Sequence, residues 1–411
     1  MACNNQIAIT GMGCMAGAGT NIDELWGNFA EGRVNCAQVP EYLFHTILEY
    51  PVFAAPENCF TERARGLVSA TAPRFRREQV SRTILLACSA TAEALDRSGI
   101  SPDSLKGKRV GIALGTTVGC TFHNEEYYQA WRDGKEPDLA PVQYYLAGNV
   151  ASALHRILGT TGPSAVITNA CASGTDAIGV ARNWLAAGLC DIAIAGGADE
   201  LSRVAYNGFV SLMLSDSEPC RPFSGDRKGL NLGEGAGVVV LERFLDTEKR
   251  GGEPLGRIRG YGCAADAWHP TAPHPEGRGL KNALAQALRD AGPDVELALI
   301  NAHGTGTRAN DVAETSALAE ILEYPEQVAI VSTKGVTGHT LGAAGGIEAI
   351  FTLMSLRAGY SPGTVGCEKV DLQLPVKPLA RNQGRELSGK IGLSESLAFG
   401  GGNSVLIMEA L

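Results

Sequence analysis

The sequence predicts a layered α/β protein made of two related halves, and three observations support this fold class. Short β-branched apolar runs alternate with helical patterns along all 411 residues. The predicted strands are continuously apolar, which is typical of strands that helices cover on both faces. A glycine-rich approach to a strand, residues 233–242 (GEGAGVVVLE), recurs 167 positions later at residues 400–409 (GGGNSVLIME). Such self-similarity indicates an internal duplication.

The elements follow in order from the spacing of apolar residues. In the first part, strands are expected at residues 7–10, 109–114, 164–168, 192–195 and 238–242, and helices at 81–98 and 175–187. In the second part, strands are expected at 297–301, 328–332, 390–394 and 405–409, and helices at 279–291, 311–322 and 345–357. The charged, glycine-rich run at 246–256 is the expected linker. We therefore divide the chain into residues 1–250 and 251–411.

The duplication also relates individual side chains. Cys171 and Gly174 match His339 and Gly342, which lie 168 positions further on. This offset predicts that Cys171 and His339 stand at corresponding helix starts and meet at the centre of the molecule.

Composition excludes several classes of protein. A net charge of −9 disfavours binding to nucleic acid. Eleven cysteines, an odd number without a Cys-x-x-Cys pair, fit neither a disulfide framework nor a zinc site, so no metal is expected. No signal peptide and no uninterrupted apolar run of about 18 residues is present, so we expect a cytoplasmic protein that does not enter a membrane.

Two further patterns have competing interpretations. Residues 63–82 hold six arginines, with only Glu78 inside the run and Glu62 just before it, which indicates either a solvated face or a docking patch for an acidic partner. Gly11 and Gly13 follow a strand, but the next glycine is Gly17, so the spacing is not that of a dinucleotide-binding loop. A tight turn after the strand is the expected reason for these glycines.

The sequence NACASG at 169–174 places Cys171 between a strand and a helix. The positive end of a helix dipole and free backbone N–H groups favour the thiolate, which is the nucleophilic form. A buried cysteine that only packs is the simpler alternative.

Two histidines give the reactive interpretation its support. His303 and His339 each follow a predicted strand in a glycine-rich segment, and Lys334 lies five residues before His339. A thiolate can take an acyl group from a thioester, and two neutral imidazoles can stabilise a developing enolate oxygen. A nearby ammonium would help to keep an imidazole neutral.

Five ordered motifs resemble those of the β-ketoacyl-acyl-carrier-protein synthases, most closely the elongating synthase II type. They are residues 169–174, 221–223 with 233–237 (RPF and GEGAG), 301–307 (NAHGTGT), 334–348 (KGVTGHTLGAAGGIE) and 399–403 (FGGGN). The resemblance implies a thiolase fold, in which two αβαβα halves form a five-layer core, and usually a dimer. It implies decarboxylative condensation of an acyl thioester on cysteine with malonyl-acyl carrier protein, without a cofactor beyond the phosphopantetheine arm that the carrier protein delivers.

The resemblance also assigns roles to residues. Cys171 is the expected nucleophile, and His303 and His339 bind the malonyl carbonyl. Lys334 is expected to support His339 and to pair with Glu314. The backbone N–H groups of Cys171 and Phe399 form the expected oxyanion hole, with Phe399 as a gate. The remaining assignments are Asp311 and Glu348 as supporting residues, Thr305 and Thr307 as contacts of the phosphopantetheine arm, Val118 in the acyl pocket, and Arg74, Arg76 and Arg77 in carrier-protein docking.

Two departures from the family pattern bear on the partner. The end motif Phe-Gly-Phe-Gly-Gly is replaced by residues 397–401 (LAFGG), and residues 40–73 do not follow the common pattern. Residues 115–121 (GTTVGCT) resemble ketosynthase subunits of type II polyketide systems. This resemblance implies a heterodimer with a chain-length factor as the alternative to a homodimer.

Three other functions were weighed. A degradative thiolase needs a second cysteine near its end, but the last cysteine is Cys367, outside any glycine-rich end motif. A chain-length factor lacks the nucleophile that Cys171 supplies. A dinucleotide-dependent reductase is disfavoured by the spacing of Gly11, Gly13 and Gly17.

Overall fold

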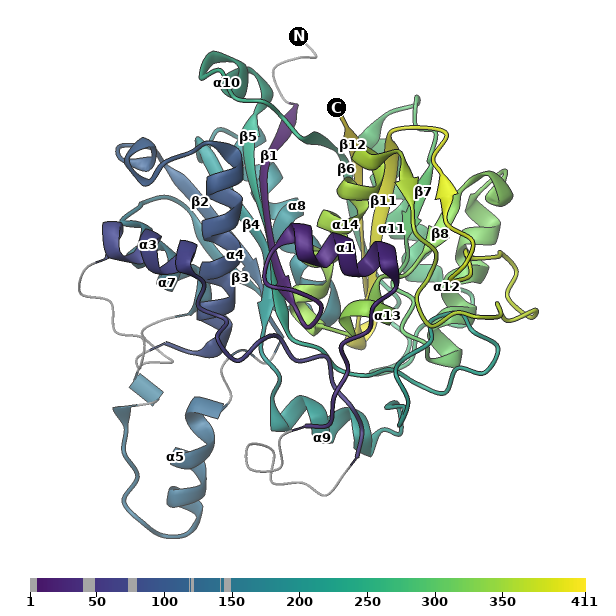
Figure 1. The fold of residues 1–411 in the computed structure, drawn as a ribbon, viewed down its shortest axis with the longest axis horizontal. Helices are drawn as coiled ribbons and strands as arrows, with labels where there is room; N and C mark the ends of the chain where they lie inside the picture. Colours follow the sequence, from purple (N-terminus) through teal and green to yellow (C-terminus); the bar gives the residue numbers. More distant parts are fainter. Residues whose placement is uncertain are drawn as a thin grey trace.

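Ten strands form a sheet with a palindromic order that joins two related halves (Figure 1). The computed structural model describes residues 6–39, 49–72, 80–117, 119, 122–140, 142, 143 and 149–411. The strand order is β3-β2-β4-β5-β1-β6-β12-β11-β7-β8. Read from its centre outward, each half has the same arrangement of five strands, so the duplication expected from the sequence is present in the fold.

The strands of the two halves have matching directions. The first half contains β1 (Ile7–Ala16), β2 (Val110–Gly115), β3 (Ser164–Ile167), β4 (Ile192–Asp199) and β5 (Gly235–Arg243). The second contains β6 (Gly256–Ala265), β7 (Leu299–Asn301), β8 (Ala329–Val331), β11 (Ile391–Leu397) and β12 (Gly402–Ala410). In each half the three outer strands are parallel and the two inner strands antiparallel. The halves join where Ile7–Ile9 of β1 pair with residues 256–258 of β6.

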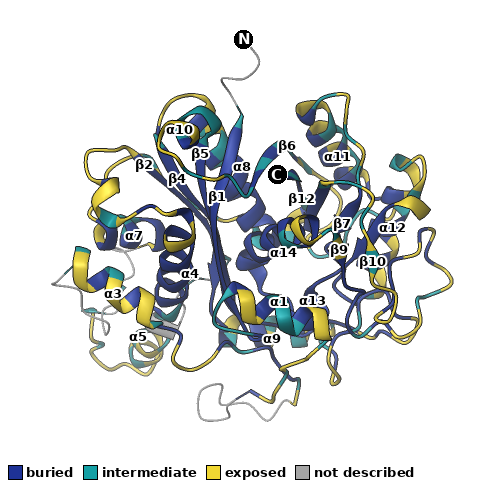
Figure 2. Ribbon diagram, turned by 45° about the horizontal axis from the view of Figure 1, so that its top comes forward, coloured by how far each residue is buried: buried dark blue, intermediate teal, exposed yellow. Residues whose placement is uncertain are grey.

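The two five-stranded halves of this sheet are called the first and the second sheet below. Helices cover the outer face of each and fill the space between them. On the outer face of the first sheet lie α3 (Glu62–Thr71), α4 (Arg82–Ser98) and α7 (Val150–Leu158). On the outer face of the second lie α11 (Arg278–Ala291) and α12 (Arg308–Ile321). The central layer is made by α8 (Ser173–Ala186) and α14 (Ala344–Ala358), which are almost entirely buried (Figure 2). These are the five layers that the resemblance implies.

The two central helices touch through glycine. A Cβ on Gly174 would lie 2.8 Å from the backbone oxygen of Gly342, and one on Gly345 would lie 2.5 Å from the backbone nitrogen of Thr175. Only residues without a side chain allow the helix starts to come this close. The close approach places both helix starts at one site.

Smaller elements complete the chain. They are α1 (Ile22–Glu31), α5 (Phe122–Arg132), α9 (Arg203–Ser211), α10 (Phe244–Lys249), α13 (Lys334–Thr337), the strand pair β9 (Tyr360–Ser361) and β10 (Arg385–Glu386), and 3₁₀ turns at Pro102–Leu105, Ala170–Ala172, Pro325–Gln327, Leu341–Ala343 and Phe399–Gly401. Figure 1 shows α5 projecting away from the body of the molecule.

Three details of the predicted organisation were wrong. Residues 250–255, within the expected linker, do connect α10 to β6, but β6 itself was missed because arginines and glycines hid this strand from the apolar pattern. Gly11 and Gly13 lie inside β1, where added Cβ atoms would meet backbone oxygens of α4 at about 2 Å, so they permit close strand–helix packing rather than a turn.

The third error concerns the offset between the halves. The turn Ala170–Ala172 precedes α8 as Leu341–Ala343 precedes α14, and these turns lie 171 positions apart. Cys171 therefore corresponds to Gly342 and not to His339.

One helical stretch, Leu341–Ala358, is long and apolar enough to cross a membrane by length and composition alone. It is 83% buried within the fold, as a core helix between two sheets would be. The expectation that the protein does not enter a membrane stays a prediction.

Candidate active site

Cys171 is held in a strained turn between β3 and α8. Ala170 has a φ of +43°, in the left-handed region that a side chain disfavours. The Ser173 hydroxyl locks the turn, because it accepts the Asn169 N–H at 2.8 Å and donates to the Ala170 oxygen at 2.6 Å. The turn aims the thiol inward, and only 4% of Cys171 is exposed.

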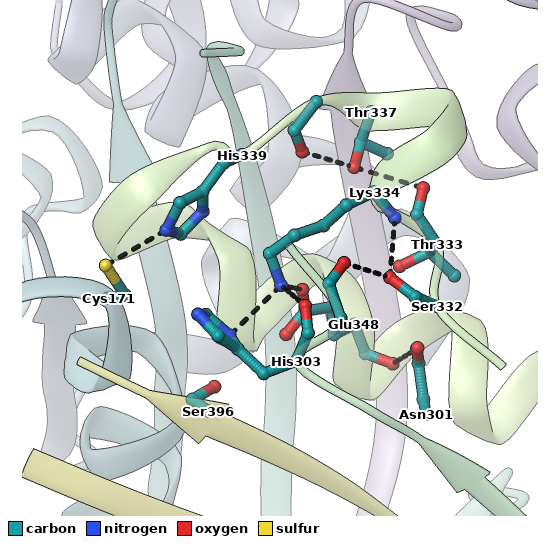
Figure 3. A network of polar contacts seen from close by, with 12 residues as sticks. Cys171, Asn301, His303, Ser332, Thr333, Lys334, Thr337, His339, Glu348 and Ser396 are labelled. Atoms are coloured by element: carbon teal, nitrogen blue, oxygen red, sulfur yellow. Dashed lines mark hydrogen bonds and ion pairs between the residues drawn. The ribbon is translucent and has the colours of Figure 1, made fainter. Parts of the chain in front are cut away.

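His339 faces this thiol from the second half. Its Nε2 lies 3.0 Å from Cys171 Sγ (Figure 3). The His339 backbone is held on both sides, since its N–H donates to the Asn231 oxygen and its oxygen accepts the Gly233 N–H. The glycine-rich motif at 233–237 thus begins where the chain fixes the position of His339.

His303 lies at the end of β7, as its position after an apolar strand predicted. The His303 and His339 ring centroids are 5.2 Å apart and nearly perpendicular. The backbone N–H groups of His303 and Gly304 both donate to the Glu314 carboxylate on α12. This buried carboxylate fixes the turn that presents the His303 ring.

Lys334 contacts His303 rather than His339, which corrects one expectation. Its Nζ lies 3.1 Å from His303 Nδ1 and 2.6 Å from the His303 backbone oxygen (Figure 3). Its ion-pair partner is Glu348 and not Glu314, which corrects a second. The contact with an ammonium makes Nδ1 of His303 an acceptor, so its ring proton resides on Nε2.

Burial determines the protonation of all three reactive groups. Burial raises the pKa of the Cys171 thiol to about 12, although Lys334 and the Phe399 backbone N–H oppose this. Burial and the Lys334 charge lower the pKa of both His303 and His339 well below the usual range. These shifts favour a thiol beside two neutral imidazoles, because desolvation opposes the help that the helix start gives to a thiolate.

A cavity of about 390 Å³ opens onto these groups. Its wall includes Cys171, His303, His339, Thr305, Thr307, Asn310 and Phe399. The hydroxyls of Thr305 and Thr307 lie 2.9 Å apart. Lys228 and Arg308 also line it, together with the exposed apolar residues Leu212 and Met213. A polar arm bearing a thioester fits such a wall.

Phe399 lies over the thiol, and an unpredicted residue supports it. The Phe399 backbone N–H donates to Cys171 Sγ. The Phe399 ring stacks on Phe209 of α9, with centroids 5.1 Å apart and an interplanar angle of 17°. Phe209 also meets the edge of His339. Nothing in the local pattern of α9 distinguishes Phe209 from an ordinary core residue.

The acidic residues that hold the backbone around the histidines do not line the cavity. Asp311 accepts backbone N–H groups of Phe223 and Gly306 and pairs with the buried Arg227. Sequence reasoning missed Glu395 of β11, whose side chain is hydrogen-bonded to Glu314. A single acid within a buried strand is the signal that could have found it.

The structure does not test the remaining predicted residues. Val118 and the docking candidates Arg74, Arg76 and Arg77 lie outside the described residues. Of the other arginines in the basic run, Arg82 is bound to Glu234 and Arg63 to Asp96. These two therefore serve the fold or the local surface.

The donor atoms of Cys171, His303 and His339 lie within 4.8 Å of one another. Such convergence also occurs in metal sites, so the expectation that the reaction needs no metal stays a prediction.

Comparison with known proteins places this geometry in a family. The models of the N-terminal and C-terminal domains of β-ketoacyl synthases match residues 4–247 and 255–368. The 3-oxoacyl-[acyl-carrier-protein] synthase 2 of Synechocystis sp. is 33% identical over 98% of both chains, and that of Vibrio cholerae is 30% identical over 99% of both.

Solved structures agree with this assignment. An ishigamide ketosynthase/chain length factor structure matches with a TM-score of 0.90 and 28% identity, covering 99% of this chain and 100% of the other. A β-ketoacyl synthase from Burkholderia phymatum gives 0.87 and 29% with the same coverage. A ketosynthase in complex with its chain length factor from Xenorhabdus doucetiae gives 0.83 and 29%, covering 99% and 98%. The chain has the thiolase fold and belongs to the β-ketoacyl synthase family.

Proposed function

We propose that the chain takes an acyl group from acyl-acyl carrier protein onto Cys171, which releases free carrier protein. It then condenses this acyl group with malonyl-acyl carrier protein to give 3-oxoacyl-acyl carrier protein and carbon dioxide, which frees Cys171. The observation that carries the proposal is the 3.0 Å contact between Cys171 Sγ and His339 Nε2, with the His303 ring beside it. The names of the relatives, which are 3-oxoacyl-acyl-carrier-protein synthases, support the same reaction.

Acylation comes first. The Cys171 sulfur attacks the thioester carbonyl while His339 Nε2 takes the thiol proton, which then passes to the departing pantetheine thiol. The Phe399 N–H, already directed at Sγ, lies where it can stabilise the negative charge on the carbonyl oxygen. This step exchanges one thioester for another and needs no cofactor.

Decarboxylation and condensation follow. The bond between the malonyl carboxylate and its α-carbon breaks, carbon dioxide leaves, and the electron pair forms an enolate whose oxygen accepts hydrogen bonds from the imidazoles. The enolate carbon attacks the acyl carbonyl, the bond to Cys171 breaks, and the released thiolate takes up one proton. Lys334 keeps the His303 proton on Nε2, where the enolate oxygen needs it.

Intact-protein mass spectrometry tests the assignment. Incubation with acyl carrier proteins bearing different acyl groups should add the mass of one acyl group to the wild type and none to Cys171→Ala. Condensation should fall by more than about 1,000-fold in Cys171→Ala, while malonyl decarboxylation persists because it does not use the thiol. Full-rate condensation by Cys171→Ala would exclude the proposal.

A second candidate is a ketosynthase subunit that works with a chain-length factor. Two of the similar structures are described as ketosynthases with a chain length factor, which favours a heterodimer over a pair of identical chains. Co-purification with a homologue lacking the cysteine, compared with the mass of the chain expressed alone, distinguishes the two.

The thiolase alternative lacks support in the cavity. Cys367 is fully buried in the outer core of the second half and does not line the cavity with Cys171. We place the protein in a reducing cytoplasm, since all nine cysteines of the described residues are free.

A further inference from the structure

Glu395 is a buried acid that the proposed reaction leaves without a role. It lies in the middle of β11, between β12 and β7, and is completely buried. Neither of its carboxyl oxygens receives a hydrogen bond from a donor among the described residues. Its side chain instead contacts the carboxyl group of Glu314 on α12. Two buried carboxyl groups in contact cannot both be ionised, so the pair holds a proton.

The hydrogen bonds show which residue holds the proton. Glu314 uses both oxygens as acceptors, one for the His303 N–H and one for the Gly304 N–H at 2.9 Å. Asn310 Nδ2 adds a third donor at 3.3 Å. No described N–H group donates to Glu395. Glu314 is therefore the carboxylate, and Glu395 is the carboxylic acid that donates to it.

The surrounding charges favour the same assignment. The groups facing the pair are Glu348 on α14, Lys334 on α13 and Asp311 on α12. Lys334 is already paired with Glu348, and Asp311 with Arg227. Burial, followed by the neighbouring Glu314 charge, raises the pKa of Glu395 well above its usual range. Burial raises the pKa of Glu314 to about 7.

We propose that Glu395 is a positioning residue, whose protonated carboxyl group holds Glu314 against the backbone turn that presents His303. The inference rests on the proposed function, because it concerns the histidine that binds the malonyl carbonyl. When Glu395 loses its proton, a second negative charge lies beside Glu314 and pulls on Lys334, so His303 loses its fixed place. Malonyl decarboxylation should therefore fall at alkaline pH.

Two variants of the full chain test this. Glu395→Gln keeps a donor for Glu314 but cannot ionise, and Glu395→Leu removes the donor. At pH 7, Glu395→Gln should decarboxylate malonyl-acyl carrier protein within about twofold of the wild-type kcat, and Glu395→Leu about tenfold more slowly or worse. Between pH 6 and 10 the wild-type kcat should fall on the alkaline side, and Glu395→Gln should lack that fall.

A buried glutamate elsewhere gives the control. Glu93 also accepts two backbone N–H groups, from Cys14 and Ile22, but lies in the first half and away from the cavity. Glu93→Gln should lower stability and keep the wild-type pH profile. Alkylation of Cys171 at pH 7 should stay within about twofold of wild type in both Glu395 variants, because positioning of His303 does not involve the thiol.

Stability gives a readout that does not depend on activity. Above the pH at which an exposed glutamate loses its proton, the native state binds one proton more than the unfolded chain through Glu395, so stability falls as pH rises. Glu395→Gln should show a shallower decline in its urea midpoint between pH 5 and 8. The inference is overturned if the wild type and Glu395→Gln show the same decline in urea midpoint, or the same fall in kcat at alkaline pH. This test holds even if Glu395→Leu does not fold. Absence of both decarboxylation and a Cys171 adduct in the wild type would instead reject the proposed function, and the urea midpoints would still locate the proton.

Discussion

In the first half, the chain leaves β3 and enters α8 through a turn in which Ala170 has a φ of +43°. In the second, it leaves β8 and enters α14 through a matching turn in which Leu341 has a φ of +53°. The next residue is Cys171 in one turn and Gly342 in the other. Gly342 offers only its backbone, whose N–H donates to Asp199 at 2.7 Å.

The connections before these turns differ in length. Only residues 168 and 169 separate β3 from its turn, but residues 332–340 separate β8 from the other. The longer connection contains α13 and carries both Lys334 and His339. One copy of the duplicated unit thus presents Cys171, and the other has extra residues that carry His339 and Lys334.

Removing the positive charge of Lys334, which lies in the longer connection, should have the largest combined effect on stability and decarboxylation. Lys334→Met leaves Glu348 buried without a partner, which should lower the free energy of unfolding by about 3–5 kcal/mol. Decarboxylation should fall about 100-fold, because His303 loses the contact that fixes its proton. Urea denaturation and carbon dioxide release measure the two effects. The double variant Lys334→Met/Glu348→Gln should regain stability and stay slow, and recovery of both would show that Lys334 only balances charge.

The equivalent turn positions should respond in opposite ways. A Cβ on Gly342 would lie 2.7 Å from the Thr116 backbone and 2.8 Å from an Asp199 oxygen, so Gly342→Ala should lose about 1–3 kcal/mol of stability. Cys171→Ala should fold nearly as stably as the wild type and lose condensation. Gly208→Ala is the control, since its Cβ meets nothing within 4 Å. Equal stability of the two glycine variants in urea would remove the proposed difference between the turns.

The protonation of the buried thiol can be tested by pH. With a Cys171 pKa of about 12, the fraction of thiolate rises with pH, so alkylation by iodoacetamide should accelerate about tenfold per unit between pH 7 and 10. The raised pKa also affects stability. The native state keeps the Cys171 proton that the unfolded chain loses near pH 9, so the free energy of unfolding should fall as the pH rises above 9. Peptide mass spectrometry separates Cys171 from the exposed Cys263. A rate that does not change below pH 8 would indicate a thiolate–imidazolium pair with His339.

The smallest effect is expected where the first half supports the gate. Phe209→Leu removes the stack under Phe399, and an aromatic pair of this kind is worth about 0.5–1.5 kcal/mol, or about two- to tenfold in acylation rate. Stopped-time mass spectrometry of acyl-Cys171 measures the rate. Tyr324→Leu, an exposed aromatic residue, is the control and should acylate at the wild-type rate. An unchanged acylation rate in Phe209→Leu would show that Phe209 does not support Phe399 in acylation.

Local patterns predicted most of the described framework. All nine expected strands and all five expected helices are present, and their bounds agree within three residues except that β1 and β4 run six and four residues further than predicted. The strand β6 was missed because Arg257, Arg259 and Tyr261 alternate with small and apolar residues. Helix α9, which carries Phe209, was also missed, because it is only nine residues long and its apolar residues at 204–206 and 209–210 cover only about two turns.

By itself the sequence determined the order of the elements, the strand-end position of His303 and the set of residues that meet at Cys171, because periodicity and motifs are local properties. Only the tertiary structure decided that Lys334 pairs with Glu348, that burial raises the pKa of Cys171, and that the counterpart of Cys171 is Gly342. Each of these depends on groups brought together from distant parts of the chain, and desolvation is a sum over all of them. The nine residues that connect β8 to the second turn give another example. Their length changes the sequence offset between the two halves, so only the packing of α8 against α14 shows which residues of the halves correspond.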